Sequence, residues 1–444
     1  MKFLWVVFIL TLGLGRLWAA EPLSLQRAQE LALEHNPLLK AAQAQVEAAQ
    51  AGVEVARSRF LPRLDVKEVY QRSDSPVYVF SSKLAQQYFR KEDFELERLN
   101  HPSPRTDIIT EVSITQPIFN RGQEIVGYRK AKIHEKMAHL YHLGVRQRVL
   151  FETERAFLEW LLTQERVQVI SSALKTAKAN LKVVKARVET GVALRSDLLQ
   201  AQVFSAAQER ELLAAQNQAE VARSRLNLVL GLPLKTLWEP LKVQIDLEKP
   251  LKPLSFWLNE ALKRRPDLLA EAARLELAHE EVRGAKLNFG PAINLRGMYE
   301  YHANNFHGVS GDAFTFMAQA DFNLFHGLGD KARLAQARAE ELSQERKLAN
   351  YRQKVKHEVE KAYLHLQTAR KQVYVTKTAV EQAEEGLRIV EKRYQQGLTI
   401  IVELLDAQTA LKKARLHYLD ALYSYRLAWT ELRFRTGTLG EEND

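Results

Sequence analysis

The residues best suited to act on ions are acids and amides in two similar stretches of the chain. Asp197 and Gln200 occupy the same places in the first stretch as Glu403 and Asp406 occupy in the second. Carboxylates that converge at a narrow opening favour cations and repel one another. Acids in the first turn of a helix have a simpler role, because they complement the helix dipole. The residues alone leave both roles open.

These stretches predict two helical hairpins. The first runs over 186–202 and the second over 392–408, with Arg, Gly, Leu-Leu and Ala-Gln in register. Gly191 and Gly397 each interrupt a long helical pattern, as a C-terminal capping glycine does. Ser196 or an acidic residue then begins the next helix.

The similarity extends over the whole chain, which reads as two copies of one unit. The register of the hairpins also pairs Phe119 with Phe325 and Gly231 with Gly437. We therefore expect one repeat over 21–231, a linker over 232–253, a second repeat over 254–440 and a tail over 441–444. The first copy carries an insertion of about twenty residues near 72–105. Neither copy has a core signal of its own, so two independent domains are not expected.

Long helices dominate the prediction. A helix over 23–59 should break or kink at Pro37. Helical patterns without internal proline cover 122–190 and 328–396, and shorter helices return over 192–230 and 398–436. Close to seventy residues at a rise of about 1.5 Å give a helix of about 100 Å, which indicates coiled-coil packing.

Alternation of apolar and polar residues predicts strands over 63–71, 106–118, 292–301 and 314–325. Val112, Phe314, Phe316 and Phe322 belong to the apolar faces. Such one-sided strands of about ten residues are typical of outer-membrane barrels. The alternative is a half-buried sheet in a soluble protein. The segment 72–105 is rich in polar and aromatic residues and predicts a long loop with one helical turn.

Export is indicated by the N-terminus. Lys2 precedes an apolar run over 3–14 that is too short to span a bilayer. We expect a signal peptide over 1–20, cleaved after Ala19 or Ala20. The chain has no cysteine, which excludes disulfides, thiolate metal sites and a cysteine nucleophile. The net charge of +10 is spread along helices and alternates with Glu, so no nucleic-acid partner is expected.

Four membrane strands cannot close a barrel, because the smallest barrels have about eight. An open sheet edge is not tolerated in lipid, so several chains must share one barrel. Two, three or four chains would supply about eight, twelve or sixteen strands.

Two groups of residues carry a resemblance to a known family. They are Gln116-Pro117-Ile118-Phe119 with Arg121-Gly122, and the stretch over 393–398 that leads into 403–408. The chain resembles the TolC-like outer membrane efflux proteins, the outer membrane factors of tripartite efflux and type I secretion systems. The resemblance implies a mainly α fold with membrane β-strands. It implies a homotrimer with a twelve-strand barrel in outer-membrane lipid and a helical periplasmic tunnel. It also implies docking to a periplasmic adaptor (membrane fusion) protein and to an inner-membrane RND or ABC-type pump. No cofactor is implied.

Carried over by position, the resemblance assigns roles at the hairpins. Glu403 and Asp406, with Asp197 and Gln200 in the first copy, would line the aperture, and Tyr394 would help to hold it closed. Thr399 stands where some members carry arginine, and Arg195 is a candidate replacement for that closing link. The positions implied to contact the adaptor are Arg187, Gly191, Val192, Arg393, Gly397 and Leu398.

The leading interpretation is a passive, non-enzymatic exit duct gated at the hairpins. The alternative is a soluble periplasmic coiled-coil scaffold or adaptor with its strands in a small sheet. A hydrolase is disfavoured, because no nucleophile elbow, phosphate-binding glycine loop or HExxH occurs. Among the histidines, His134, His139 and His142 read as solvated, and His302 and His307 lie in a predicted loop. No metal site is expected.

Overall fold

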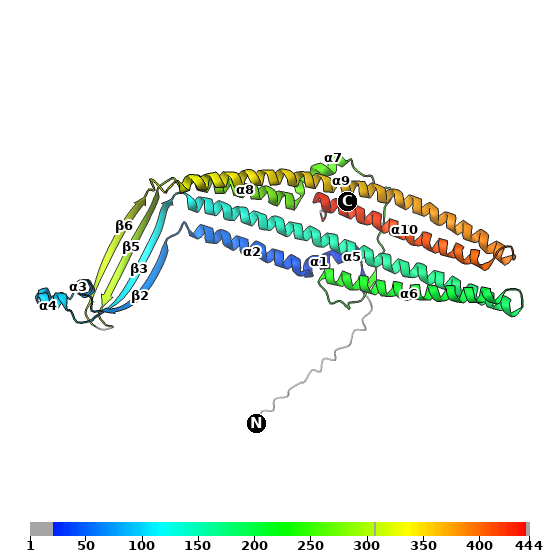
Figure 1. The fold of residues 1–444 in the computed structure, drawn as a ribbon, viewed down its shortest axis with the longest axis horizontal. Helices are drawn as coiled ribbons and strands as arrows, with labels where there is room; N and C mark the ends of the chain where they lie inside the picture. Colours follow the sequence, from blue (N-terminus) through cyan, green and yellow to red (C-terminus); the bar gives the residue numbers. More distant parts are fainter. Residues whose placement is uncertain (1–20, 306–307, 441–444) are drawn as a thin grey trace, which may run out of the picture. The chain divides into compact units, whose positions relative to one another are not determined.

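The computed structural model describes residues 21–305 and 308–440, so the predicted signal peptide, His307 and the tail lie outside the described residues. Most of the chain is helical (Figure 1). The elements are β1 (Glu21–Leu23), α1 (Leu25–His35), α2 (Pro37–Ser58), β2 (Arg63–Ser73), α3 (Pro76–Ala85), η1 (Lys91–Phe94), α4 (Leu96–Asn100), β3 (Arg105–Asn120), α5 (Gln123–Glu189), α6 (Arg195–Leu230), β4 (Trp238–Pro240), α7 (Leu254–Arg264), α8 (Pro266–Leu287), β5 (Ala292–Ala303), β6 (Ser310–Asp321), α9 (Gly329–Gln395) and α10 (Ile401–Thr436). None of the described helices is long and apolar enough to cross a membrane.

The compact units of the structure do not coincide with the two repeats. One unit takes residues up to Ala42, His142–Pro266 and Gln353 onward, and the other takes Gln43–Tyr141 and Asp267–Arg352. Each unit is therefore built from both copies of the repeat. The long helices α5 and α9, of 67 residues each, run from one unit into the other. This is why neither copy shows a self-sufficient core in the sequence.

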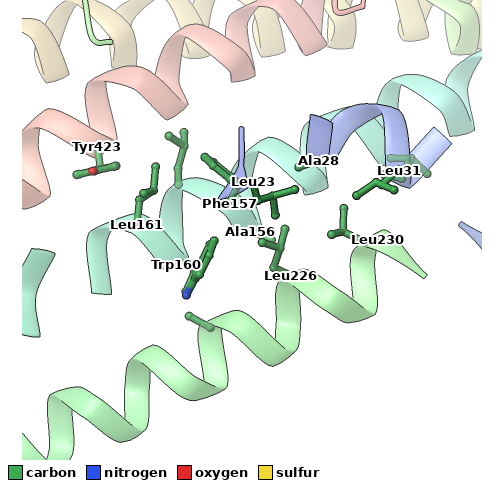
Figure 2. Close-up of a cluster of buried hydrophobic side chains, with 14 residues drawn as sticks. Leu23, Ala28, Leu31, Ala156, Phe157, Trp160, Leu161, Leu226, Leu230 and Tyr423 are labelled. Atoms are coloured by element: carbon green, nitrogen blue, oxygen red, sulfur yellow. The ribbon is translucent and has the colours of Figure 1, made fainter. Parts of the chain in front are cut away.

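The helical unit is centred on an apolar cluster in which α1, α5 and α6 meet (Figure 2). Phe157 and Trp160 of α5 are completely or almost completely buried there, and their rings lie 6.1 Å apart in an edge-to-face contact. Leu226 and Leu230 contribute from α6, and Leu23 from β1. Burial of a large aromatic side chain stabilises the folded state by about 2–3 kcal/mol. Short β1 pairs in parallel with β4, which lies in the predicted linker.

Two glycines hold the ends of α6 and α10 in matching ways. Gly231 and Gly437 follow these helices with φ of +75° and +74°. A Cβ on Gly231 would lie 2.7 Å from the carbonyl oxygen of His35. A Cβ on Gly437 would lie 2.9 Å from the carbonyl oxygen of Arg264. In both copies a side chain at this position would collide with backbone at the C-terminal end of a short helix, α1 or α7, just before a proline.

The four longer strands form one antiparallel sheet in the order β2-β3-β5-β6. Its register places the apolar positions of all four strands on one face. One row runs Val66, Val112, Tyr299 and Phe314, and the next runs Leu64, Ile114, Gly297 and Phe316. Val66 and Phe314 are 70% and 72% exposed, so a large apolar surface lies open to the surroundings. We call this the apolar face.

The opposite face is polar. Its rows include Lys67, Glu111 and Glu300, and Arg296 donates to Glu111 at 2.8 Å. A continuous apolar face opposite a charged face is the pattern of a sheet between lipid and water. We call this charged surface the polar face. The edge strands of the sheet are β2 and β6.

One predicted strand is displaced. The sequence predicts a strand over 314–325, whereas β6 spans Ser310–Asp321. The reason lies in its partner, because β5 begins at Ala292, directly after Pro291, and Ala292 pairs with Asp321. Proline has no N–H to continue the ladder. Phe322, predicted to face the membrane from within this strand, therefore lies just beyond the strand and is 58% exposed.

The insertion of the first copy also differs from the prediction of a long loop. Residues 76–100, which we call the β2–β3 insertion, contain α3, η1 and α4. Pro76 occupies the first turn of α3, where a missing N–H costs nothing. The insertion has its own aromatic contacts, with the ring of Phe89 4.8 Å from Phe80 and 5.0 Å from Phe94. Its helices are short, and contacts between its successive segments supply their packing.

Candidate functional site

Both hairpins close with the same backbone hydrogen bonds. The N–H of Val192 donates to the carbonyl of Arg187 at 2.8 Å, and the N–H of Leu398 donates to Arg393 at 2.9 Å. Between them Gly191 and Gly397 have φ of +76° and +73°. This is the Schellman arrangement, in which a left-handed residue satisfies carbonyls at the end of a helix. The sequence match between the copies thus corresponds to a match in backbone geometry.

A small apolar cluster joins the two hairpins. Its buried members are Val184 of α5, Ala201 of α6 and Ile401 of α10, and Tyr394 of α9 packs against them. All four long helices of the helical unit therefore contribute to one cluster beside the turns. The hairpins are positioned by this contact as well as by their own turns.

Arg187 makes a polar link across the hairpins. Its guanidinium carbon lies 5.1 Å from the centre of the Tyr394 ring. The same group donates to the carbonyl oxygens of Tyr394 and Gln395, each at 3.4 Å. A cation over an aromatic face contributes about 0.5–2 kcal/mol. The equivalent residue of the second copy, Arg393, is exposed, and its side chain has no hydrogen bond or ion pair among the described residues.

Of the four aperture candidates, Asp197 and Glu403 lie in the first turns of α6 and α10, and Gln200 and Asp406 lie one turn further along. Glu403 and Asp406 are exposed, and the hydroxyl of Thr399 donates to Glu403. Asp197 accepts a long hydrogen bond of 3.4 Å from the N–H of Leu194. Within one chain, Asp197 thus serves as an acceptor at the N-terminus of α6, and Glu403 accepts from a hydroxyl that precedes α10. Arg195 is exposed and makes no side-chain hydrogen bond among the described residues.

Gln200 and Asp406 are brought together on one groove between α6 and α10. The groove has a volume of about 570 Å³ and is otherwise mostly apolar. Its apolar lining includes Leu199, Val203 and Val402, which are 54%, 71% and 40% exposed. Glu403 and Asp197 do not line this groove. A groove with this lining suits an apolar surface of another protein better than a small ion.

The turn residues themselves are open to solvent. Val192 and Leu398 are 75% and 65% exposed, and Leu194 and Ile400 repeat this pattern two residues later at 69% and 65%. Each turn therefore presents two apolar side chains in matching positions. Exposed apolar residues in a repeated arrangement are features of a contact surface.

Sequence reasoning did not identify a polar layer between α6 and α10. The ammonium of Lys412, which is 9% exposed, donates to Gln208 at 2.9 Å and pairs with Glu211. A buried lysine is stabilised only when it is paired and hydrogen-bonded. The signal was present as Gln and Lys at helical core spacing, but such residues read equally well as a solvated face. The layer fixes the register of α6 against α10.

No group of three or more His, Asp or Glu side chains that could hold a metal ion is present within residues 21–305 and 308–440. His302 is not in a loop, as expected from the sequence, but in β5, where its ring nitrogen lies 2.9 Å from Asp107. This pair belongs to the sheet.

Comparison with known proteins identifies the family. The family model described as "Outer membrane efflux protein" matches residues 28–232 and 257–438. The chain belongs to the outer membrane efflux protein family. The resemblance drawn from the sequence is therefore confirmed, and so are the fold class and the location in the outer membrane with extension into the periplasm.

Two relatives and one solved structure show how far the similarity reaches. The alkaline protease secretion protein AprF of Pseudomonas aeruginosa is 25% identical over 426 residues, which cover 94% of this chain and 85% of AprF. TolC of Escherichia coli is 22% identical, with 97% of this chain and 85% of TolC covered. The CmeC outer membrane channel of Campylobacter jejuni superposes with a TM-score of 0.77 at 17% identity, over 95% of this chain and 87% of CmeC. Relatives of this kind support a channel role in efflux or secretion.

Proposed function

We propose that the protein is the exit duct of a tripartite efflux or type I secretion system and that three copies form the duct. The observation that carries this proposal is the sheet with one apolar face and two edge strands. In lipid, unpaired backbone N–H and C=O groups cost several kcal/mol each, so β2 of one chain must pair with β6 of another. Three chains of four strands give a twelve-strand barrel whose polar faces enclose the lumen.

The hairpins form the gate of this duct. The link from Arg187 to Tyr394 holds the two hairpins of one chain together. Around the three-fold axis, exposed Glu403 and Asp406 of each chain would form rings of negative charge. Rings of carboxylates favour cations over anions at a constriction.

The exposed turns and the groove between α6 and α10 receive the periplasmic adaptor. In three copies, the matching turns of the two repeats would present six similar apolar knobs, each built from a pair such as Val192 and Leu194. The adaptor would connect these knobs to an inner-membrane RND or ABC-type pump. AprF, named for alkaline protease secretion, suggests protein cargo, whereas the family description refers to efflux.

The first test is the protein molar mass of the detergent-extracted complex, measured by light scattering with the detergent subtracted. Three chains' worth of mass supports the shared barrel. A monomer that stays in solution without detergent means that the apolar face does not meet lipid, and the soluble scaffold is then the better interpretation.

The gate is tested by ion selectivity in a planar bilayer. The double variant Glu403→Ala with Asp406→Ala should lower the preference for cations, because it removes both rings of charge. Glu391→Ala, on the last turns of α9, is a matched control for a lost carboxylate outside the aperture. Unchanged selectivity and conductance in the double variant would remove these acids from the gate.

A further inference from the structure

The β2–β3 insertion is a folded body attached to the end of the sheet. The ammonium of Lys83 in α3 binds the carboxylate of Asp93 at 2.6 Å, and the N–H of Arg90 donates to the same carboxylate at 2.9 Å. The aromatic contacts of Phe89 with Phe80 and Phe94 lie in the same body. Burial raises the pKa of the Tyr78 phenol, and its hydroxyl donates to the carbonyl of Gln71 at 3.0 Å. These contacts hold the segments of the insertion against one another.

A buried polar network joins the insertion to the sheet. Gln86, which is fully buried, donates to Asp107 at 2.9 Å and to the carbonyl of Thr106 at 3.0 Å. Arg105 donates to the side-chain oxygen of Gln86 at 2.8 Å. Asp107 in turn contacts His302 on the neighbouring strand. Each of these groups is satisfied, so the contact is specific and rigid.

This network lies on the polar face. Asp107 alternates with Ile108 of the apolar face, and it lies on the same side of β3 as Glu111 and Ser113. Gly311 pairs with His302 and also belongs to the polar face. A Cβ on Gly311 would collide with the carbonyl oxygen of Ala85 and lie 2.7 Å from the side chain of Gln87. The end of α3 therefore covers the polar face of β3, β5 and β6.

The insertion also lies at one end of the strands. It leaves β2 after Ser73 and enters β3 at Arg105, and these two residues pair at the end of the ladder. Figure 1 shows α3 and α4 at the strand ends that lie away from α2. Since α2 leads into the other end of β2, the insertion covers the outer end of the sheet.

Several apolar side chains of the insertion remain largely exposed. Val77, Leu84, Phe94 and Leu96 are 80%, 51%, 64% and 76% exposed. Four exposed apolar residues within 20 positions provide surface that a protein contact could bury. The sheet to which the body is fixed has edge strands that pair with other copies in the proposed barrel. The polar faces of those copies would enclose a lumen on the side of the sheet that the end of α3 covers.

We propose that the β2–β3 insertions of the three copies meet inside the outer end of the barrel and form a second constriction there. The contact is between copies of this chain, made by Val77, Leu84, Phe94 and Leu96. An apolar constriction impedes water and ions because it loses water easily. This proposal rests on the proposed function, since a lumen exists only if the chains share a barrel.

Labelling from outside the cell tests the constriction, and the absence of cysteine makes the chain well suited to it. Met317 lies on the polar face of β6 and is 47% exposed, so Met317→Cys reports on access to the lumen. Intact cells are treated with a membrane-impermeant maleimide that carries a large polymer. Reagent enters from the outer end, so the state of the periplasmic hairpins does not affect the result.

Two variants, each combined with Met317→Cys, open the constriction in different ways. Gly311→Val displaces α3 by collision, and Ala313→Val, two residues along the same face but exposed, is its control. The second variant replaces residues 74–104 with Asn-Gly, a two-residue turn that suits the pairing of Ser73 with Arg105. Labelling of the introduced thiol should accelerate at least about tenfold in both variants, because reactivity scales with the open fraction. Equal rates in the parent and in the Asn-Gly variant would overturn the proposal.

Cross-linking tests the contact between copies. Each of the four apolar positions is changed to Cys in turn and treated with a bifunctional maleimide. At least one should give linked dimers and trimers. Tyr299→Cys, on the apolar face of a central strand, should give none.

A mass of three chains, without cross-links and with equal labelling rates in the parent and in the opening variants, would contradict the constriction and leave the proposed duct supported. If light scattering gives a monomer, the duct itself fails.

Discussion

The two copies of the repeat agree at their hairpins and differ at their strand ends. Both hairpins close with the same hydrogen bonds around a left-handed glycine. By contrast, β2 and β3 are joined through the folded insertion of residues 76–100, whereas β5 and β6 are joined by the few residues over 304–309. In the proposed trimer, six matching turns would face one partner, which favours symmetry between the copies at the hairpins. At the other end of the sheet a single insertion per chain would suffice, so the symmetry can be lost there.

The largest effect is expected at the β2–β3 insertion, where the two copies differ. Gln86→Leu removes the group that joins Arg105 to Asp107, so half-buried Arg105 and buried Asp107 each lose a hydrogen bond. We expect the local stability of the insertion to fall by about 3 kcal/mol. Hydrogen exchange of residues 76–100 measures this loss. Ser81→Ala, which removes an exposed hydroxyl on the same helix, should change exchange little. Equal protection in the Gln86 variant and the parent would show that the network does not hold the insertion.

The glycines that occupy matching positions in the two copies provide a set of four variants. Gly231→Ala and Gly437→Ala combine a left-handed φ with collision against backbone, and each should cost about 2–3 kcal/mol. Gly191→Ala and Gly397→Ala have the same φ but open space around the Cβ, so each should cost only about 1–2 kcal/mol. Thermal unfolding of the detergent-solubilised protein should rank the variants in this order. Similar losses at all four positions would mean that the close backbone approach is not what matters.

A smaller effect should distinguish the equivalent arginines of the two hairpins. Arg187→Ala removes a cation–π contact and two hydrogen bonds, whereas Arg393→Ala removes an exposed side chain. We expect a loss of about 1–2 kcal/mol in the opening free energy of the hairpins for Arg187 and less than about 0.5 kcal/mol for Arg393. Hydrogen exchange over 181–201 and 394–405 reports this opening. If both variants behave alike, the link across the hairpins has no role in closure.

The smallest effect is a pH dependence of the insertion. Burial would raise the pKa of Asp93, but its hydrogen bonds with Lys83 and Arg90 outweigh burial and hold the pKa below its usual value. Such a carboxylate stabilises the fold above its unfolded pKa of about 4 and loses that contribution as the pH falls through the folded value. The other charged neighbour, Arg98, stays cationic throughout. Protection of residues 76–100 should therefore decline below about pH 4. Asp93→Asn should make this decline disappear, and its persistence would assign the effect to another group.

Much of the fold could be predicted from the sequence because it depends on local periodicity. The strand alternation of Val112 and the capping role of Gly191 and Gly397 follow from one stretch of chain each. The end of β6 at Asp321 could not be predicted in this way, since Pro291 on the partner strand sets it. The folded insertion was also missed, because Gln86 and Asp107 stabilise it across 21 positions. At the hairpins the candidates could be named, but the pairing of Arg187 with Tyr394 depends on contacts between the two copies.

The two edge strands also determine how quickly the protein can enter a membrane. Within one chain, the outer edges of β2 and β6 carry backbone groups that no strand of that chain can pair. A barrel made by one chain closes by itself, at a rate independent of how many other chains are present. In the proposed trimer, insertion must wait for encounters between chains, so its rate should rise steeply with the periplasmic concentration of the chain. Until those encounters occur, each exported chain carries strand edges open to wrong partners, and halving its supply would lower channel number by more than half.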